Sequence, residues 1–209
     1  GVIFQTRYTQ SVEKLRKMIS QGAFGKIISA RSILTWNRPA EYYQNSDWKG
    51  TWDKEGGGVL IDQAIHSLDR VRYMIGSDVE WIDGSIHNYA HDFVSVEDTA
   101  SAAVMFKNGC LYNVYACNTY GANSPITIEL LGEKGRCGLI KDRGYYELDG
   151  TYAEIHNSGE TVDIGLDYWG DSHHLQLESF YRSVLTDSPV LTDGLEGRKT
   201  LEMVKGIYL

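Results

Sequence analysis

Residues 56–76 of this chain read GGGVLIDQAIHSLDRVRYMIG. The stretch opens on three glycines, continues in helical register for about five turns, and closes on Gly76, a residue type that commonly ends helices. At roughly 100° per residue, one broad and mostly apolar stripe faces the core, whereas Gln63, Ser67 and Arg70 lie opposite and are expected to face water. The stripe consists of Ile61, Ala64, Ile65, Leu68, Val71, Arg72 and Ile75.

Asp62 and His66 lie on a third stripe of this helix and are candidate catalytic residues. They are four residues apart, so their side chains share one face. A neighbouring carboxylate raises the pKa of an imidazole and fixes its orientation, as a general acid–base near neutral pH requires. The glycines let a ligand approach the backbone, and a helix N-terminus favours anionic or hydroxyl-rich groups. The alternative is an ordinary surface or capping interaction.

The composition is that of a globular protein: of 209 residues, 42% are hydrophobic and 23% charged. Because the net charge is -8 and no basic cluster occurs, we expect neither nucleic acid nor a membrane as partner. The sequence has no apolar run of transmembrane length and no secretory pattern, and its start on apolar residues without Met suggests a fragment of a longer protein. Cys110, Cys117 and Cys137 lack CxxC spacing, which favours core residues in a reducing, cytoplasmic compartment.

Strand-like periodicity dominates the middle of the chain, and helical periodicity occurs toward both ends. The pattern predicts an α+β fold, with a large, mostly antiparallel open-faced sheet and helices packed on one face. Because the other face is partly apolar, we expect self-association through it. Strands are expected at 1–8, 27–36, 79–89, 98–106, 111–118, 126–132, 136–140, 144–148 and 151–156, and helices at 11–21, 58–75, 172–186 and 195–209.

Residues 38–56 are expected to form a long loop rich in aromatic and basic side chains. Long ordered loops in compact domains tend to carry function. The alternative is that the rings only pin the loop to the body of the protein. The side chains concerned are Arg38, Tyr42, Tyr43, Trp48, Lys49 and Trp52.

Motifs for nucleotide and metal binding are absent from the sequence. Neither GxGxxG after a strand nor GxxxxGK[ST] occurs, so the chain is not expected to hold a nucleotide by itself. Of the six histidines, His87 and His91 are four apart, but on a predicted strand and loop, where this spacing does not converge on one ion. No metal site is therefore predicted.

Several segments together resemble the C-terminal domain of the Gfo/Idh/MocA oxidoreductases, the family of glucose–fructose oxidoreductase and inositol dehydrogenase. The sequence WKGTW at 48–52, followed by GGGVLIDQAIHSLD at 56–69, carries most of this resemblance. The segments FQTRY at 4–8, GAFGKI at 22–27 and DGLEGRKTLE at 193–202 resemble the family's first strand after the cofactor domain, its G-x-[IL]-G-[KE]-[IV] turn and its closing helix. The set covers nearly the whole chain in the right order.

The resemblance implies a dihydrodipicolinate reductase-like domain, in which residues 1–209 form one substrate-binding and oligomerisation domain of a two-domain enzyme. The N-terminal Rossmann domain, which would bind most of the NAD or NADP, is absent from this sequence. Such enzymes transfer hydride to or from a hydroxyl-bearing carbon, usually of a sugar or cyclitol. They commonly assemble through the open sheet, so a homodimer or homotetramer is implied. This fragment alone is expected to be inactive.

The resemblance also implies roles for individual residues. The family's D-x-x-x-H motif maps onto Asp62 and His66. By this resemblance, His66 takes the proton of the substrate hydroxyl as hydride leaves, and Asp62 orients the imidazole and favours its charged form. Two other functions stay open, a non-catalytic sugar- or partner-binding module of the same fold and a metal hydrolase. The retained Asp62 and His66 count against the binding module. The implied substrate-binding residues are Arg7, Trp36, Arg38, Tyr42 and Tyr43, and the implied cofactor-binding residues are Trp48 and Trp52.

Overall fold

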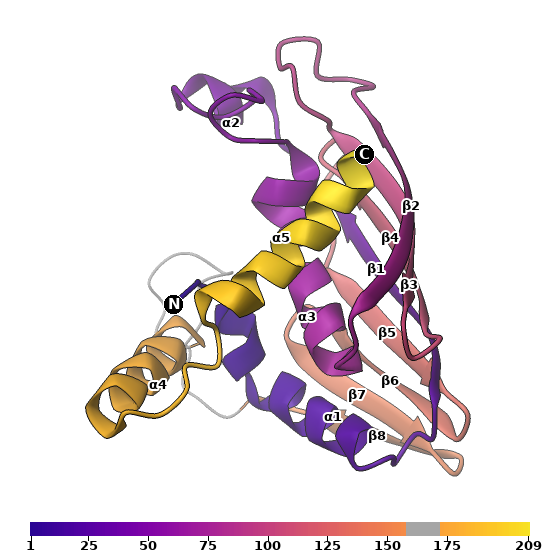
Figure 1. Cartoon of the computed structure of the whole chain (residues 1–209). Coiled ribbons are helices and arrows are strands. Elements are labelled where there is room, and N and C mark those ends of the chain that lie inside the picture. Colours follow the sequence, from indigo (N-terminus) through magenta and orange to yellow (C-terminus); the bar gives the residue numbers. More distant parts are fainter. Residues whose placement is uncertain (158–171) are drawn as a thin grey trace.

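An eight-stranded sheet forms the body of the computed structural model, which describes residues 1–157 and 172–209 (Figure 1). The strand order is β2-β3-β4-β1-β5-β6-β7-β8. Strands β1 and β4 run parallel, and every other neighbouring pair is antiparallel. The predicted α+β class with a mostly antiparallel sheet is therefore confirmed. The strands are β1 (Ile27–Thr35), β2 (Val79–His87), β3 (Thr99–Phe106), β4 (Leu111–Cys117), β5 (Thr127–Gly132), β6 (Gly135–Ile140), β7 (Arg143–Leu148) and β8 (Thr151–Ile155).

Helices cover one face of the sheet and leave the other face open, as predicted (Figure 1). Helix α1 packs against β6 and β7, α3 against β1, and α5 against β2. Helices α2 and α4 extend away from the sheet (Figure 1). The helical elements are η1 (Gln5–Tyr8, 3-10), α1 (Gln10–Ser20), α2 (Ala40–Gln44), η2 (Leu60–Ala64, π), α3 (Ile65–Ile75), α4 (Ser172–Thr186) and α5 (Gly194–Tyr208).

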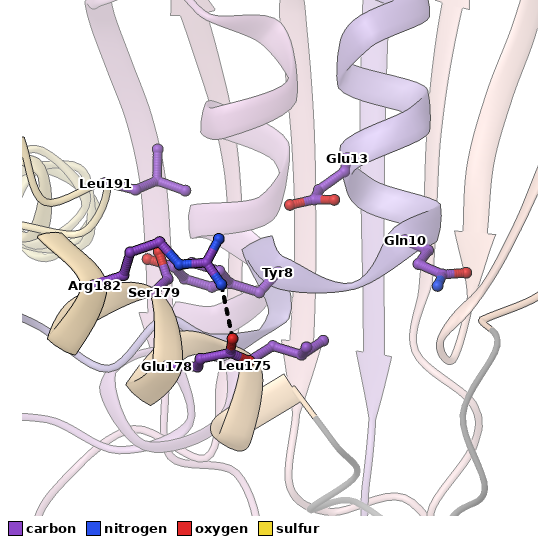
Figure 2. Close-up of a pocket in the computed structure, with 8 residues that line it drawn as sticks. All are labelled: Tyr8, Gln10, Glu13, Leu175, Glu178, Ser179, Arg182 and Leu191. Atoms are coloured by element: carbon purple, nitrogen blue, oxygen red, sulfur yellow. Dashed lines mark hydrogen bonds and ion pairs between the residues drawn. The ribbon is translucent and has the colours of Figure 1, made fainter.

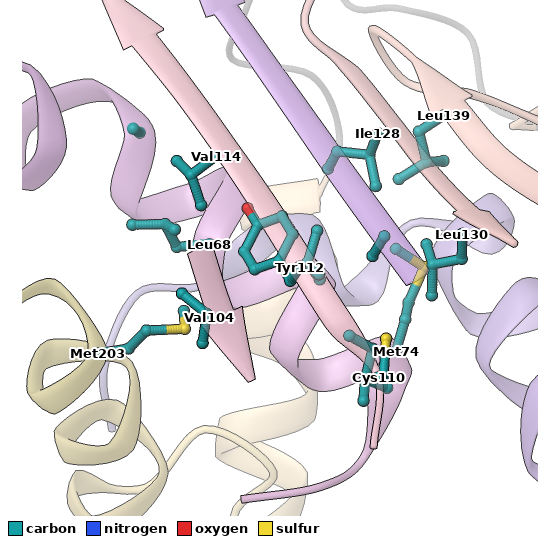
Figure 3. Packing of buried hydrophobic residues seen from close by; sticks show 14 of the residues in the cluster. Leu68, Met74, Val104, Cys110, Tyr112, Val114, Ile128, Leu130, Leu139 and Met203 are labelled. Carbon is teal, nitrogen blue, oxygen red and sulfur yellow. The ribbon is translucent and has the colours of Figure 1, made fainter. Parts of the chain in front are cut away.

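The hydrophobic core fills the space between the covered sheet face and the helices (Figure 3). Because successive side chains of a strand point to opposite faces, Tyr112 and Val114 of β4 are buried, whereas Asn113 and Tyr115 are exposed. Leu68 of α3 packs over Tyr112 and Val114 from the helical layer (Figure 3). This packing holds α3 in place across the sheet.

The central helix predicted over 58–75 is confirmed, and it ends at Gly76 in the left-handed conformation, with φ at 66°. It begins with the π turn η2, a rare element that is frequent at functional sites. The prediction that Gln63, Ser67 and Arg70 face water is wrong, because all three are buried. The helix lies among α1, α5, η1 and the sheet, so little of its surface remains for water.

Residues 1–8 do not form the predicted strand. Instead, Val2 donates its amide to the Thr192 carbonyl at 2.7 Å, and Arg7 donates its amide to the Phe4 carbonyl, which closes the 3-10 turn η1. The Arg7 side chain points inward to Asp69 of α3. This tertiary contact draws the segment into the helical layer and overrides its strand-like pattern.

The open face of the sheet combines apolar side chains with ion pairs. Tyr115 and Leu131 are exposed there. Arg31 pairs with Glu129 at 3.1 Å across neighbouring strands β1 and β5. The partly apolar character predicted for this face is therefore confirmed.

The three cysteines are free and buried, in agreement with the predicted core positions. Within residues 1–157 and 172–209, no helix combines the length and apolarity needed to cross a membrane.

Candidate active site

The glycine run before α3 packs against the protein's own chain. The buried Glu97 carboxylate accepts hydrogen bonds from the amides of Gly58 at 2.8 Å and Leu60 at 3.0 Å, so it occupies the N-terminus of the helix. A Cβ at Gly58 would overlap the Glu97 carbonyl oxygen, and one at Gly57 would overlap the Tyr208 hydroxyl. The predicted approach of a ligand is therefore wrong for Gly57, Gly58 and the helix end, whereas Gly56 borders open space.

Asp62 lies in the π turn, half-buried, with its carboxylate held by two neighbours. The Tyr42 hydroxyl of α2 donates to Asp62 Oδ2 at 2.7 Å, and Gln63 Nε2 donates to the same oxygen. Burial and the bond to Asp62 raise the pKa of the Tyr42 hydroxyl, so Tyr42 stays protonated as the donor. The carboxylate thus has a fixed place at the junction of α2 and the central helix.

His66 presents a buried imidazole nitrogen, Nδ1, that has no hydrogen-bond partner. Its ring packs edge-on against Phe4, with 6.0 Å between the ring centroids. Burial lowers the pKa of His66, the nearby Arg70 charge lowers it further, and Asp62 acts weakly in the opposite direction. An unpaired nitrogen on a neutral imidazole is equipped to accept a proton.

The direct Asp62–His66 pair predicted from the spacing does not form. Asp62 instead pairs with Tyr42 and Gln63, and no ion pair or hydrogen bond links its carboxylate to His66 in the described part of the chain. The predicted rise of the His66 pKa is also wrong, since burial of the imidazole and the Arg70 charge together outweigh the carboxylate. Both residues nevertheless lie on consecutive turns of one helix, as predicted.

Three of the predicted substrate-binding side chains, Trp36, Arg38 and Tyr42, form a cluster that reaches Asp62 through Tyr42. The Arg38 guanidinium lies 4.6 Å from the Trp36 ring centroid and 5.0 Å from that of Tyr42. The ammonium of Lys49 lies on the Tyr42 ring as well, at 3.4 Å. Such cation–π contacts connect the end of β1, the start of α2 and the following loop.

Tyr43, Trp48 and Trp52 occupy different surroundings. Tyr43 is buried, and its hydroxyl accepts a hydrogen bond from Asn118 Nδ2 at 3.3 Å. Trp48 is 44% exposed and Trp52 is 42% exposed. The Trp52 indole donates to the Ser95 carbonyl at 2.8 Å, so this ring pins its loop while one side stays accessible.

Arg7 is fully buried, in a polar cluster among η1, α3 and α5. Its guanidinium binds Asp69 through two hydrogen bonds, of 2.7 and 2.6 Å, and Glu196 at 3.1 Å. Thr200 donates to the same Asp69 carboxylate at 2.7 Å. With its donors directed at these partners, Arg7 has no accessible surface for the predicted substrate contact, and its place is structural.

Sequence reasoning missed Gln63 and Asn118. Gln63 was expected at the surface, but it bridges Asp62 and Asn118, whose Nδ2 donates to Gln63 Oε1 at 2.8 Å. The sequence signal for Asn118 is a polar residue at the end of an otherwise regular strand pattern. The two residues are 55 positions apart, so only the tertiary fold brings Asn118, which follows β4, to Gln63 of the π turn.

A cavity of about 390 Å³ opens elsewhere, where η1 and α1 meet α4 (Figure 2). Among its lining side chains, Arg182 pairs with Glu178 at 2.8 Å. Burial raises the pKa of Glu13 at the same cavity. None of the predicted site residues lines it, so we do not assign the candidate active site to this hollow.

No group of three or more His, Cys, Asp or Glu side chains suited to holding a metal ion occurs in residues 1–157 and 172–209.

Comparison with known proteins shows where this architecture recurs. Residues 12–137 match the model of the GFO/IDH/MocA C-terminal domain. The chain is 22% identical over 209 residues to D-xylose 1-dehydrogenase [NADP(+)] of Haloarcula marismortui, covering 99% of this chain and 56% of that protein. It is 26% identical to myo-inositol 2-dehydrogenase of Thermotoga maritima, covering 95% of this chain and 58% of that protein. The chain thus spans little more than half the length of these curated relatives.

Solved structures give the same result. The WlbA dehydrogenase from Bordetella pertussis, in complex with NADH and UDP-GlcNAcA, is 28% identical with a TM-score of 0.80. The match covers 99% of this chain and 59% of that one. Levoglucosan dehydrogenase, in complex with NADH and levoglucosan, shares the fold at a TM-score of 0.83 and 21% identity, with 98% of this chain and 62% of that one covered.

Proposed function

Since this chain belongs to the GFO/IDH/MocA family, we propose that it is the C-terminal part of an NAD(P)-dependent dehydrogenase. Its substrate is a sugar or cyclitol, oxidised or reduced at a hydroxyl-bearing carbon. The names of the xylose and inositol dehydrogenases among its relatives support this substrate class. Residues 1–209 then form a single substrate-binding and oligomerisation domain, and a Rossmann domain elsewhere in the full-length protein binds most of the cofactor.

The unpartnered Nδ1 of His66 carries the proposal. Buried polar atoms are almost always hydrogen-bonded, so an orphaned nitrogen indicates a partner that arrives with the substrate. The lowered pKa of His66 keeps the imidazole neutral near pH 7, ready to take the hydroxyl proton. A bound nicotinamide would supply the hydride acceptor, and His66 would take the proton of the substrate hydroxyl as that carbon becomes a carbonyl.

Asp62 supports His66 through its charge in this proposal. Its carboxylate favours the protonated imidazole, which balances part of the opposing effect of Arg70. Tyr42 and Gln63 hold the carboxylate in place while the charge on the imidazole changes. Asp62 thus stabilises the imidazolium that forms as the substrate loses its proton.

Substrate hydroxyls bind at the cluster of Trp36, Arg38 and Tyr42 in this proposal. Arg38 Nε is buried without a partner, which suits a substrate oxygen. The buried Tyr43 packs edge-on against the Tyr42 ring and so supports the cluster. Arg7 is not proposed as a substrate-binding residue, because it is fully buried. The exposed rings of Trp48 and Trp52 contact the cofactor in this proposal.

The test is NAD(P)-linked oxidation of sugars and cyclitols by the full-length protein. His66→Ala should lower kcat by about 10²–10⁴-fold, the usual contribution of a general acid–base. His156→Ala is the matched control, since His156 is exposed and directly follows β8, the last strand of the sheet. Near-normal turnover of a folded His66→Ala protein would refute the assigned role.

We also propose a homodimer or homotetramer assembled through the open sheet face, in the cytoplasm. The exposed Tyr115 and Leu131 beside the Arg31–Glu129 pair support such an interface, because apolar and charged groups alternate across it. The three free cysteines support a reducing compartment. Light scattering of a Leu131→Glu variant tests the interface, since a charge there should yield monomers, and an unchanged mass would contradict it.

A further inference from the structure

Hydrogen bonds from Asn118 through Gln63 connect the end of β4 to Asp62, and Tyr42 joins them at the carboxylate. Asn118 Nδ2 donates to Gln63 Oε1 at 2.8 Å, and Gln63 Nε2 donates to Asp62 Oδ2. Gln63 Nε2 also lies 3.2 Å from the Tyr42 hydroxyl, which itself donates to Asp62. Asn118 and Gln63 are both buried, so water does not replace these bonds.

The direction of these bonds matters because an amide has one donor end and one acceptor end. In the observed sense, Asn118 offers its NH2 group to the Gln63 oxygen, and Gln63 therefore offers its own NH2 group to Asp62. With Gln63 reversed, its oxygen would face the Asp62 carboxylate, and two acceptors would oppose each other. Only one orientation of Gln63 is therefore compatible with a charged Asp62.

Asn118 is itself fixed by its backbone. Its amide donates to the Asp98 carbonyl at 2.8 Å, and its carbonyl accepts from the Arg38 amide at 2.9 Å. Its side chain also donates to the buried Tyr43 hydroxyl at 3.3 Å. The end of the sheet thus holds the Asn118 side chain against Gln63 and Tyr43, where its Nδ2 donates to both and its Oδ1 has no hydrogen-bond partner.

We propose that Asn118 is a positioning residue for Asp62: by donating to Gln63, it fixes the amide orientation in which Gln63 holds the carboxylate. The consequence for catalysis rests on the proposed function, in which Asp62 stabilises the protonated His66. The consequence for folding does not, since it depends only on the polarity of the hydrogen bonds.

Asn118→Asp in the full-length protein tests the relay with almost no change of shape. The new carboxylate accepts from Gln63, which turns its oxygen toward Asp62. We expect the melting temperature to fall by about 3 °C or more, as for a lost buried hydrogen bond. We expect kcat to fall about tenfold or more while KM changes less than about threefold. Gln21→Glu, the same type of exchange at an exposed position after α1, is the control and should change neither.

Adding Asp62→Asn to Asn118→Asp is the decisive step. The introduced amide at position 62 donates to the reversed Gln63, so the melting temperature should recover while kcat stays low. In a Gln63→Met background the recovery should disappear, because the relay runs through Gln63 and not through direct repulsion of two charges. Failure of Asp62→Asn to restore the melting temperature, or equal recovery with Gln63→Met, would overturn the proposal. An inactive wild-type protein would instead refute the proposed function, and the melting temperatures would still decide the relay.

Discussion

Replacing Asp69 by Ala should be among the most destabilising single changes outside the apolar core. The Arg7 guanidinium is fully buried and binds Asp69 through two hydrogen bonds, so the substitution leaves a buried charge without its main partner. Removal of one partner of a buried ion pair costs about 3–5 kcal/mol. Glu196, 3.1 Å from Arg7, compensates part of this loss, while Thr200 loses the acceptor of its hydroxyl. We therefore expect a decrease of about 4 kcal/mol in the free energy of unfolding.

Urea unfolding of the full-length protein measures this change, with the free energy extrapolated linearly to water. Glu178→Ala is the matched control, because it breaks the exposed Glu178–Arg182 pair of α4 and should cost less than about 0.5 kcal/mol. The double variant Asp69→Leu with Arg7→Met removes both charges, so its free energy of unfolding should fall by no more than about 2 kcal/mol relative to the wild type. An Asp69→Ala protein as stable as the surface control would refute the reasoning.

Three further predictions concern the glycine run and two carboxyl groups. Gly58→Ala should lower the free energy of unfolding by about 3 kcal/mol or more, because the new Cβ overlaps the Glu97 carbonyl. Gly56→Ala, in open space at φ 84°, should lower it by about 1 kcal/mol, and thermal unfolding compares the two variants. Burial raises the pKa of Glu196, but hydrogen bonds from basic neighbours outweigh this effect and lower the pKa from 4.5 to about 2. The protein should therefore lose stability as the pH falls from 4.5 toward 2, and Glu196→Gln should flatten this pH dependence in unfolding measurements. Burial raises the pKa of Glu55 from 4.5 to about 7, so folding favours its protonated form. The stability of the protein should therefore decline as the pH rises from 4.5 to 7. Glu55→Gln should remove this decline, and a variant with the same pH profile of stability as the wild type would contradict the prediction.

Local patterns in the sequence predicted most elements of the fold. Period-two alternation located β4 within one residue of its observed end, and Gly76 marked the end of α3. The strand order was not predicted, since the placement of β1 between β4 and β5 depends on pairing between distant segments. The π turn and the burial of Arg70 also escaped prediction, because both arise from elements that pack around the helix.

The sequence predicted that Asp62 and His66 share one helix, but it did not predict which side chains contact them. The spacing of Asp62 and His66 placed them on one helix, as observed. Spacing alone does not reveal other hydrogen-bond partners, and the Asp62 carboxylate accepts from the hydroxyl of Tyr42, 20 residues earlier in the chain. Glu97 and Asn118 likewise act through contacts that join distant segments.

The central position of β1 has a consequence for how the chain acquires its structure during synthesis. Ser29 pairs with Leu111 on one side and with Leu131 on the other. A ribosome therefore releases β1 well before either neighbour, and both edges of this strand stay unpaired until residues 111–132 have been made. Because closure of the sheet awaits such remote partners, folding should be slow, and the unpaired edges of nascent β1 are exposed to wrong pairing in the meantime.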